Sequence, residues 1–262
     1  MKRALAAIVL AILPSLASAD LAEIKARGTL RVLYVPSNTP DEFFDMKSPD
    51  RPGFDRELLE GFAQLQRVKL ETVSVTGWDE LAPALAKGRG DLAAGRYSIT
   101  KSRKQLVNFS SEVFPTRNVV VTRKPTPLVT TLDELLRERI GTVRGSSMAE
   151  TLADAHVPAA RIDNSLRPGL QAAALVDGRV SAVVMGVENA ISAQRRDAAM
   201  QLGMFLGPPG SLAYALRKQD PELQRALDAY IESAHRSTVW SRLVVKYFGE
   251  AAIEVLKKAR AQ

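Results

Sequence analysis

Cysteine is absent from this chain of 262 residues, histidine occurs twice, and aromatic residues make up only 6% of it. The absence of cysteine excludes a disulfide framework, a thiolate metal site and a lipid attached at an export cleavage site. The histidines, His156 and His235, lie far apart, and neither has the spacing of a metal ligand. Each ends a helix-like pattern, where the helix dipole favours a cation. We therefore expect no metal site and no cofactor.

Motifs of several large enzyme classes are also missing. The sequence contains no P-loop, no dinucleotide-binding glycine fingerprint and no G-x-S-x-G nucleophile elbow. Without these motifs, the sequence gives no direct sign of phosphate, dinucleotide or acyl chemistry. We therefore expect a protein that is not an enzyme.

The excess of positive charge is spread along the chain. Lysine and arginine outnumber the acidic residues by 36 to 29, which gives a formal net charge of +7. Such an excess is compatible with nucleic acid or anionic lipid as a partner. The basic residues are scattered, however, and few aromatic residues accompany them. We therefore expect no nucleic-acid partner.

Only the first residues form a long apolar run. The basic pair at residues 2–3 precedes the apolar segment 4–16, and small residues follow at 17–19. This order is typical of a secretory signal peptide, here cleaved after Ala19, and predicts export to the periplasm. A retained anchor is the alternative, although the segment contains Pro14 and is shorter than the roughly 20 apolar residues of a bilayer span.

The rest of the chain alternates between strand-like and helix-like spacing of apolar residues, which predicts an α/β fold. The strand-like segments are 29–35, 68–75, 91–95, 118–123, 139–145, 181–186 and 211–217. The helix-like segments are 52–66, 78–88, 101–107, 131–139, 146–155, 167–178 and 220–236. The length allows one large domain or two small ones.

Two segments that contain proline lie beside apolar strands and are candidate joints between lobes. These are RKPTPLVTT at 123–131 and LGPPGS at 206–211. If the chain crosses at both, residues 124–210 form one lobe. Residues 20–123 and 211–262 together form the other. Apolar periodicity alone does not prove this crossing.

The segment RYSITKSR, residues 96–103, places basic residues around a turn rich in hydroxyl groups. Thr100 is a suitable N-cap for a helix that would then carry cations in its first turn, where they oppose the helix dipole. One interpretation is a solvated turn. The other is a site for an anion, gripped by Arg103 in a bidentate way and by the hydroxyl of Ser98. One such charge-assisted bond contributes about 1.5–3 kcal/mol, which outweighs the local repulsion.

A second candidate anion site lies in VRGSSMAETL, residues 143–152. Ser146 or Ser147 caps the helix that follows, and Ser147 with Glu150 has the spacing of a capping box. Capping explains one serine, whereas a helix N-terminus that faces a ligand anion would use both. Trp78 begins another predicted helix and is either a core residue or an aromatic surface against which a ligand stacks.

Taken in order, several segments resemble the family 3 extracellular solute-binding proteins, the periplasmic amino-acid receptors of ABC importers. These segments, which span 28–249, are GTLRVLYV, GFDRELLEGFA, WDELAPALAKGRGDLAAG, SITKSRKQLVNFSSEVF, RIGTVRGSSMAETL and LVDGRVSAVVMG. The resemblance implies two α/β lobes joined by two crossing strands, the type II or flytrap fold of periplasmic binding proteins. It also implies a small carboxylate-bearing ligand and a membrane permease as partner, and we expect a monomer.

The resemblance also implies roles for particular residues. In the family, the residues that match Ser98 and Arg103 hold the ligand's α-carboxylate. Hydroxyl and amide groups at the position of Ser146 and Ser147 reach it from the second lobe, and the residue that matches Trp78 packs on the ligand. Only the closed state makes both sets of bonds, which gives the ligand a reason to favour closure.

The sequence departs from the family pattern within the ligand site. Gly186 stands where an aspartate usually takes the ligand's ammonium, and Glu188 is the candidate substitute. Arg96 replaces a small residue, and Val35 and Asn38 replace an aspartate and an aromatic residue after the first strand. An added arginine and a lost aspartate favour a ligand with extra negative or polar character, such as a dicarboxylate. A pairing of Arg96 with a nearby acid would remove this argument.

Two other functions remain open. Some relatives of the fold are periplasmic dehydratases of prephenate-like acids, and such a site would need Glu188 or Asp41 as a general acid. Other relatives are sensory or wall-associated proteins in which the module is fused to a kinase or a transglycosylase. The sequence ends at Gln262 without such a domain, from which we expect an unfused protein.

Overall fold

The computed structural model describes residues 21–45 and 50–260. The predicted signal peptide, residues 1–19, lies outside this range. Within the described ranges, no helix combines the length and the apolar character that a membrane span requires.

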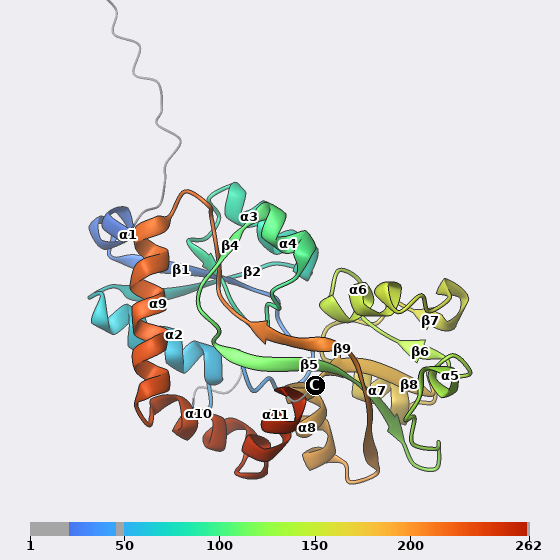
Figure 1. The fold of residues 1–262 in the computed structure, drawn as a ribbon. Helices are drawn as coiled ribbons and strands as arrows, with labels where there is room; N and C mark the ends of the chain where they lie inside the picture. The colour runs from blue at the N-terminus through green and yellow to red at the C-terminus, as the bar shows by residue number, and fades with distance from the viewer. Residues whose placement is uncertain (1–20, 46–49, 261–262) are drawn as a thin grey trace, which may run out of the picture.

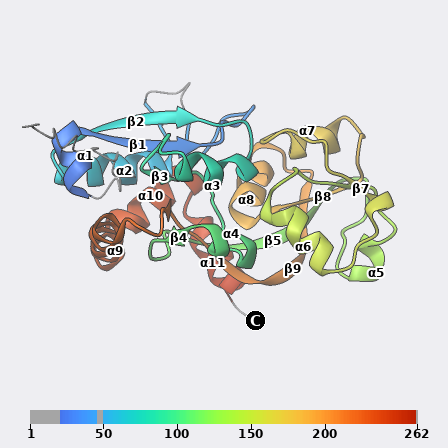
Figure 2. The same cartoon turned by 90° about the horizontal axis from the view of Figure 1, so that it is seen from above.

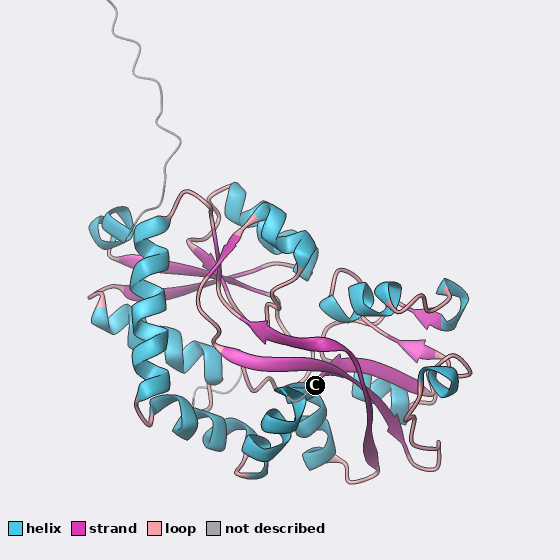
Figure 3. Ribbon diagram, viewed as in Figure 1, coloured by secondary structure: helices cyan, strands magenta, loops and turns pink. Residues whose placement is uncertain are grey.

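The described chain folds into two mixed sheets of five strands each, with helices packed against them (Figures 1 and 3). The first sheet has the order β2-β1-β3-β10-β4 and the second has the order β7-β6-β8-β5-β9. The strands are β1 (Thr29–Tyr34), β2 (Lys69–Ser74), β3 (Leu92–Ala93), β4 (Asn108–Phe109), β5 (Phe114–Arg123), β6 (Ile140–Gly141), β7 (Ile162–Asp163), β8 (Ala182–Gly186), β9 (Met200–Leu212) and β10 (Ala215–Leu216). The predicted α/β class is confirmed.

Helices alternate with the strands along most of the chain. They are α1 (Leu21–Arg27), α2 (Phe54–Leu65), α3 (Trp78–Ala86), α4 (Lys101–Leu106), α5 (Leu132–Leu135), α6 (Ser147–Asp154), α7 (Gln171–Val176), α8 (Val187–Arg196), α9 (Pro221–Arg236), α10 (Val239–Phe248) and α11 (Ala251–Arg260), with a 3-10 turn at Ala159–Arg161. Figures 1 and 2 show α1, α2 and α9 at one end of the molecule and α5 at the other. Helices α8 and α11 pack against β5 and β9.

Apolar spacing explains why these segments form their elements. In α2, Phe54, Leu58, Leu59 and Phe62 are buried, at the spacing of one helix face. In β8, every residue of the run AVVMG is buried, as expected for a strand covered on both faces. These two elements therefore bury their apolar residues in the way that a layered α/β fold requires.

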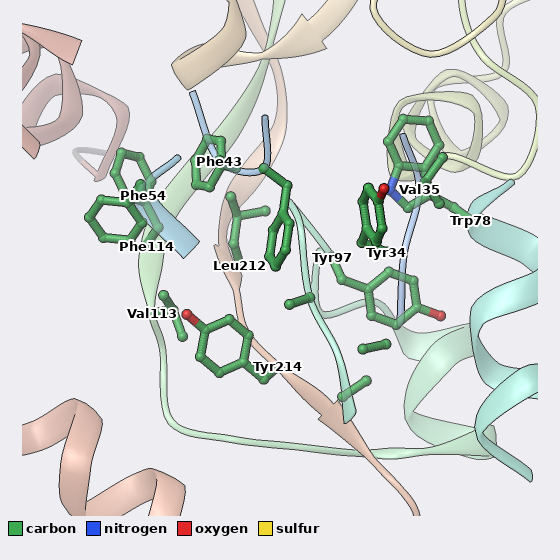
Figure 4. Close-up of a cluster of buried hydrophobic side chains, with 14 of the residues drawn as sticks. Tyr34, Val35, Phe43, Phe54, Trp78, Tyr97, Val113, Phe114, Leu212 and Tyr214 are labelled. Carbon is green, nitrogen blue, oxygen red and sulfur yellow. The ribbon is translucent and has the colours of Figure 1, made fainter. Parts of the chain in front are cut away.

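Strands β5 and β9 run as an antiparallel pair from one core to the other (Figure 1). At one end, the Phe114 ring lies 5.3 Å from the Phe43 ring (Figure 4). Farther along β5, Val120 packs in the second core with Ile140. The ladder is irregular between Thr116 and Asn118. Two strands therefore cross between the lobes, as the resemblance implied, whereas the exact lobe boundaries stay a prediction.

Candidate functional site

The turn before α4 builds one wall of the candidate site. The Arg103 N–H donates to Thr100 Oγ1 over 3.3 Å, so Thr100 caps α4 as predicted. The buried guanidinium of Arg103 donates through Nη1 to the Ser98 carbonyl at 2.9 Å and through Nη2 to the Gly145 carbonyl at 3.1 Å. It also lies 4.1 Å from the centre of the Tyr97 ring. Burial lowers the pKa of Arg103, and its contacts fix the guanidinium between two loops.

The turn before α6 builds the opposite wall. Ser146 is the N-cap, because its Oγ accepts from the Ala149 N–H at 3.3 Å and donates to the Val143 carbonyl at 2.6 Å. Ser147 is thereby left to face the other wall, where its Oγ lies 3.0 Å from Ser98 Oγ. The structure thus assigns the two serines different tasks, with one hydroxyl used for capping and one directed into the cleft.

Arg96 points into the same cleft. Its Nη2 forms an ion pair with Asp41 Oδ2 at 2.6 Å, and the two side chains are only 9% and 2% exposed. Its Nη1 donates to Asn189 Oδ1 at 3.3 Å, and the guanidinium carbon lies 5.9 Å from the centre of the Trp78 ring. The cation of Arg96 is therefore paired inside the protein rather than held in solvent.

Asp55 holds the backbone that carries Arg96. Its Oδ2 accepts from the Gly95 N–H at 2.9 Å and from the Arg96 N–H at 3.4 Å, and its Oδ1 accepts from Tyr214 Oη at 3.2 Å. Arg96 has φ of 62°, a left-handed conformation that is uncommon outside glycine. Burial raises the pKa of Asp55 to about 7.

Glu188 takes the space of the side chain that Gly186 lacks. A Cβ added to Gly186 would lie 2.0 Å from Glu188 Oε1, so the carboxylate occupies the volume of a side chain at position 186. Thr116 Oγ1 donates to Glu188 Oε2 at 2.6 Å. The side chain is buried, and this burial raises the pKa of Glu188. The carboxylate of Glu188 therefore lies beside Gly186, and its role as a substitute for the aspartate of the family pattern stays a prediction.

Two adjoining small cavities lie between these groups. The smaller encloses about 20 Å³, and its lining includes Trp78, Arg96, Ser98, Arg103, Ser147 and Glu188. The larger encloses about 50 Å³, and its lining includes Thr39, Trp78, Arg96, Met148, Met185 and Asn189. The structure thus brings together most of the residues expected at the site from the sequence.

Asn38 is the exception among those residues, because it lines neither of these two cavities. Its backbone N–H and its side-chain Nδ2 both donate to the Pro168 carbonyl, at 3.1 Å and 2.9 Å. Thr116 and Asn189 line the cavities although the sequence pattern does not single them out. Asp41 is suggested by the sequence only as the acid of an enzyme. The position of Asn189 in the first turn after β8 is the one signal that could have indicated it.

Among the described residues, no cluster of histidine, cysteine, aspartate and glutamate has the arrangement of a metal site. The chemical capacity of the cleft therefore lies in the pairs Arg96–Asp41 and Arg196–Glu42, in Arg103 and Glu188, and in hydroxyl groups and one indole. Trp78 Nε1 is buried and has no hydrogen-bond partner within the described part of the chain.

The sequence matches the family model of bacterial extracellular solute-binding proteins, family 3, over residues 30–250. It is 28% identical over 245 residues to membrane-bound lytic murein transglycosylase F of Stutzerimonas stutzeri (strain A1501), covering 89% of this chain and 49% of the relative. It is 26% identical over 237 residues to a probable histidine-binding protein of Neisseria gonorrhoeae, covering 87% of each.

Solved structures share the fold. The ancestral amino-acid-binding protein AncCDT-1, a precursor of cyclohexadienyl dehydratase, has a TM-score of 0.77 and 26% identity, and the match covers 87% of this chain and 99% of that one. A solute receptor for L-cysteine of Neisseria gonorrhoeae has a TM-score of 0.78 and 20% identity over 89% of this chain and 96% of that one. The two-lobed fold is thereby confirmed.

The expectation that this protein is not an enzyme is corrected by these findings. Relatives matched over 89% of this chain are named as lytic murein transglycosylases. One structural neighbour is named as the precursor of a dehydratase. The chain spans about half the length of the transglycosylase relatives it matches. The relationship to proteins named as enzymes could not be seen from the missing motifs. A motif search covers only a few active-site patterns, whereas this relationship extends over most of the chain.

Proposed function

Because the chain belongs to the bacterial extracellular solute-binding proteins of family 3, as the resemblance in its sequence indicated, we propose that it binds a small zwitterionic solute in the interlobe cleft. The solute class is the α-amino acids and close relatives. One observation carries the proposal: Arg103 and Glu188 line the same cavity. A guanidinium and a carboxylate in one small space complement a ligand that bears a carboxylate and an ammonium.

The carboxylate end of the ligand binds at Arg103. The guanidinium has N–H groups beyond those that bond to the carbonyls of Ser98 and Gly145. The hydroxyls of Ser98 and Ser147, 3.0 Å apart, supply donors from both walls. A carboxylate that accepts from both hydroxyls would bond to both lobes at once, and its binding energy would therefore favour the closed state.

The ammonium end of the ligand binds at Glu188. Burial raises the pKa of this carboxyl because a charge removed from water is unfavourable, and a ligand cation beside it offsets that cost. Arg96 is already paired with Asp41, so it provides no spare positive charge. Arg196 is likewise paired with Glu42, so Arg103 and Glu188 are left as one cation and one acid, which favours a zwitterion over the dicarboxylate that the sequence alone suggested.

We further propose that the protein is exported to the periplasm, with cleavage after Ala19, and delivers its ligand to the membrane permease of an ABC importer. Membership of an extracellular solute-binding family supports this role. Loss of ligand uptake in cells that lack the protein, measured with radiolabelled solute, is the expected result. Unchanged uptake would contradict the transport role.

A second candidate function is that of a ligand-binding module in a cell-wall enzyme. The names of the transglycosylase relatives favour it, together with the fact that this chain spans about half their length. The discriminating measurement is peptidoglycan cleavage by the natural full-length protein, with and without the solute that binds the cleft. A dehydratase-like activity, favoured by the likeness to AncCDT-1, is tested by turnover of prephenate or arogenate.

The binding proposal is tested first by mass spectrometry of the solute that co-purifies, and then by calorimetric titration of Arg103→Gln. Loss of one charge-assisted contact of about 1.5–3 kcal/mol weakens binding roughly 10- to 150-fold. Lys104→Gln changes an exposed cation on the same helix and is expected to bind like the wild type. An affinity that Arg103→Gln leaves intact would contradict the proposed clamp.

A further inference from the structure

Arg96 has the surroundings that a bound guanidinium ligand would require. Its guanidinium contacts a carboxylate of Asp41 at 2.6 Å and an amide oxygen of Asn189 at 3.3 Å, and it lies 5.9 Å from the Trp78 ring. A carboxylate, an amide acceptor and an aromatic face are the groups that recognise guanidinium ions in proteins. Here the cation belongs to the protein itself.

The backbone holds Arg96 in this position against its own preference. Its φ of 62° places a non-glycine residue in the left-handed region, which is disfavoured by the Cβ atom. The bonds from the N–H groups of Gly95 and Arg96 to Asp55 keep this turn in place. A strained backbone that is held by buried partners and aims a side chain into a cleft is typical of a functional constraint.

The side chain of Arg96 takes up room within the cleft. It lines both cavities, which enclose about 50 Å³ and about 20 Å³. Pockets for small molecules usually enclose about 300–1,000 Å³. The lining of the larger cavity includes Met148 and Met185 together with Glu42, whose carboxylate is paired with Arg196. Because that acid already has its cation, the space beyond the Arg103–Glu188 pair suits a short uncharged group rather than a long cationic one.

We propose that Arg96 is a tethered occupant of a guanidinium subsite formed by Asp41, Trp78 and Asn189, and that it restricts the ligand to amino acids with short, uncharged side chains. A ligand with a basic side chain is refused because Arg96 fills the space, repels a second cation and neutralises Asp41. The restriction on the ligand rests on the amino-acid binding proposed above. The subsite itself does not.

Removal of Arg96 therefore leaves a buried Asp41 without its cation, and a guanidinium from solution can take its place. The variant Arg96→Gly is suited to the test because glycine adopts φ of 62° without strain. Arg96→Gln is a second variant that keeps a long polar side chain without the charge. Arg89→Gly changes an exposed arginine of the same lobe and is the matched control.

The experiment measures thermal shifts with millimolar methylguanidinium, and calorimetric binding of L-arginine, L-alanine and L-cysteine. Methylguanidinium is expected to raise the melting temperature of Arg96→Gly by several degrees and to leave the wild type and Arg89→Gly unchanged. L-arginine is expected to bind Arg96→Gly at least tenfold more tightly than the wild type. The second substitution Asp41→Asn in the Arg96→Gly background is expected to abolish both gains.

The outcomes separate the two proposals. If Arg96→Gly and Arg96→Gln bind short amino acids as before but respond neither to methylguanidinium nor to L-arginine, the tethered-occupant proposal is overturned and the binding function stands. If the wild type binds no amino acid while methylguanidinium stabilises Arg96→Gly in a manner that requires Asp41, the subsite stands and the binding function fails. Tight binding of L-arginine by the wild type would also overturn the inference.

Discussion

Replacement of Gly186 with alanine is expected to lower the free energy of unfolding by about 1.5–3 kcal/mol, because Glu188 occupies the space that a Cβ would need. The added Cβ would lie 2.0 Å from Glu188 Oε1, well inside van der Waals contact, so the carboxylate has to move. It then loses the 2.6 Å bond from Thr116, and a buried hydrogen bond to a charged group contributes about that amount. The backbone adds nothing, since Gly186 has φ of −63°, which suits alanine.

The assay is a double-mutant cycle in urea with Gly186→Ala, Glu188→Ala and the double variant. Because Glu188→Ala removes the atom that clashes, Gly186→Ala should be nearly neutral in that background, and the two changes should be non-additive by about 1.5–3 kcal/mol. Ala190→Gly, in the same helix, provides a control for general weakening of α8. Equal effects of Gly186→Ala in both backgrounds would refute the explanation.

Thr100→Ala should lower the free energy of unfolding in urea by about 1 kcal/mol, because it removes the 3.3 Å hydrogen bond from the Arg103 N–H to Thr100 Oγ1. An unchanged urea midpoint would show that water replaces this hydrogen bond. Asp55 has a folded-state pKa of about 7 against an ordinary value of 3.8. Its contribution to stability is therefore full below about pH 4 and is lost as the pH rises through about 7, by up to about 4 kcal/mol. Asp55→Asn should lack this loss, so a constant difference between variant and wild type from pH 4 to 8 would contradict the assignment.

Much of the fold and part of the site could be predicted from the sequence because they depend on local patterns. The apolar runs of β1 and β8 and the face of α2 follow simple periodicity. Thr100 caps α4 as its position in the pattern suggests. The resemblance placed Ser98 and Arg103 in one cleft, where both line the same cavity.

Contacts between distant residues were not predictable in the same way. Arg96 and Asp41 pair through a turn whose geometry depends on Asp55, and no spacing rule joins these positions. The carboxylate of Glu188 lies beside Gly186. This placement depends on the conformation of the Glu188 side chain, which the sequence does not specify. Asn38 was expected to line the pocket because it follows the first strand, yet its amide donates to the Pro168 carbonyl.

The irregular ladder at Thr116 has a mechanical consequence. A strand bends locally where its ladder is irregular, and the first of the two irregularities in the β5–β9 ladder lies between Thr116 and Asn118. Thr116 also donates to Glu188, the carboxylate proposed to receive the ligand's ammonium. A change of bend at this irregularity would therefore move the hydroxyl group that donates to Glu188, so that a shape change of the ribbon and the hydrogen bonding of this carboxylate would be coupled through Thr116.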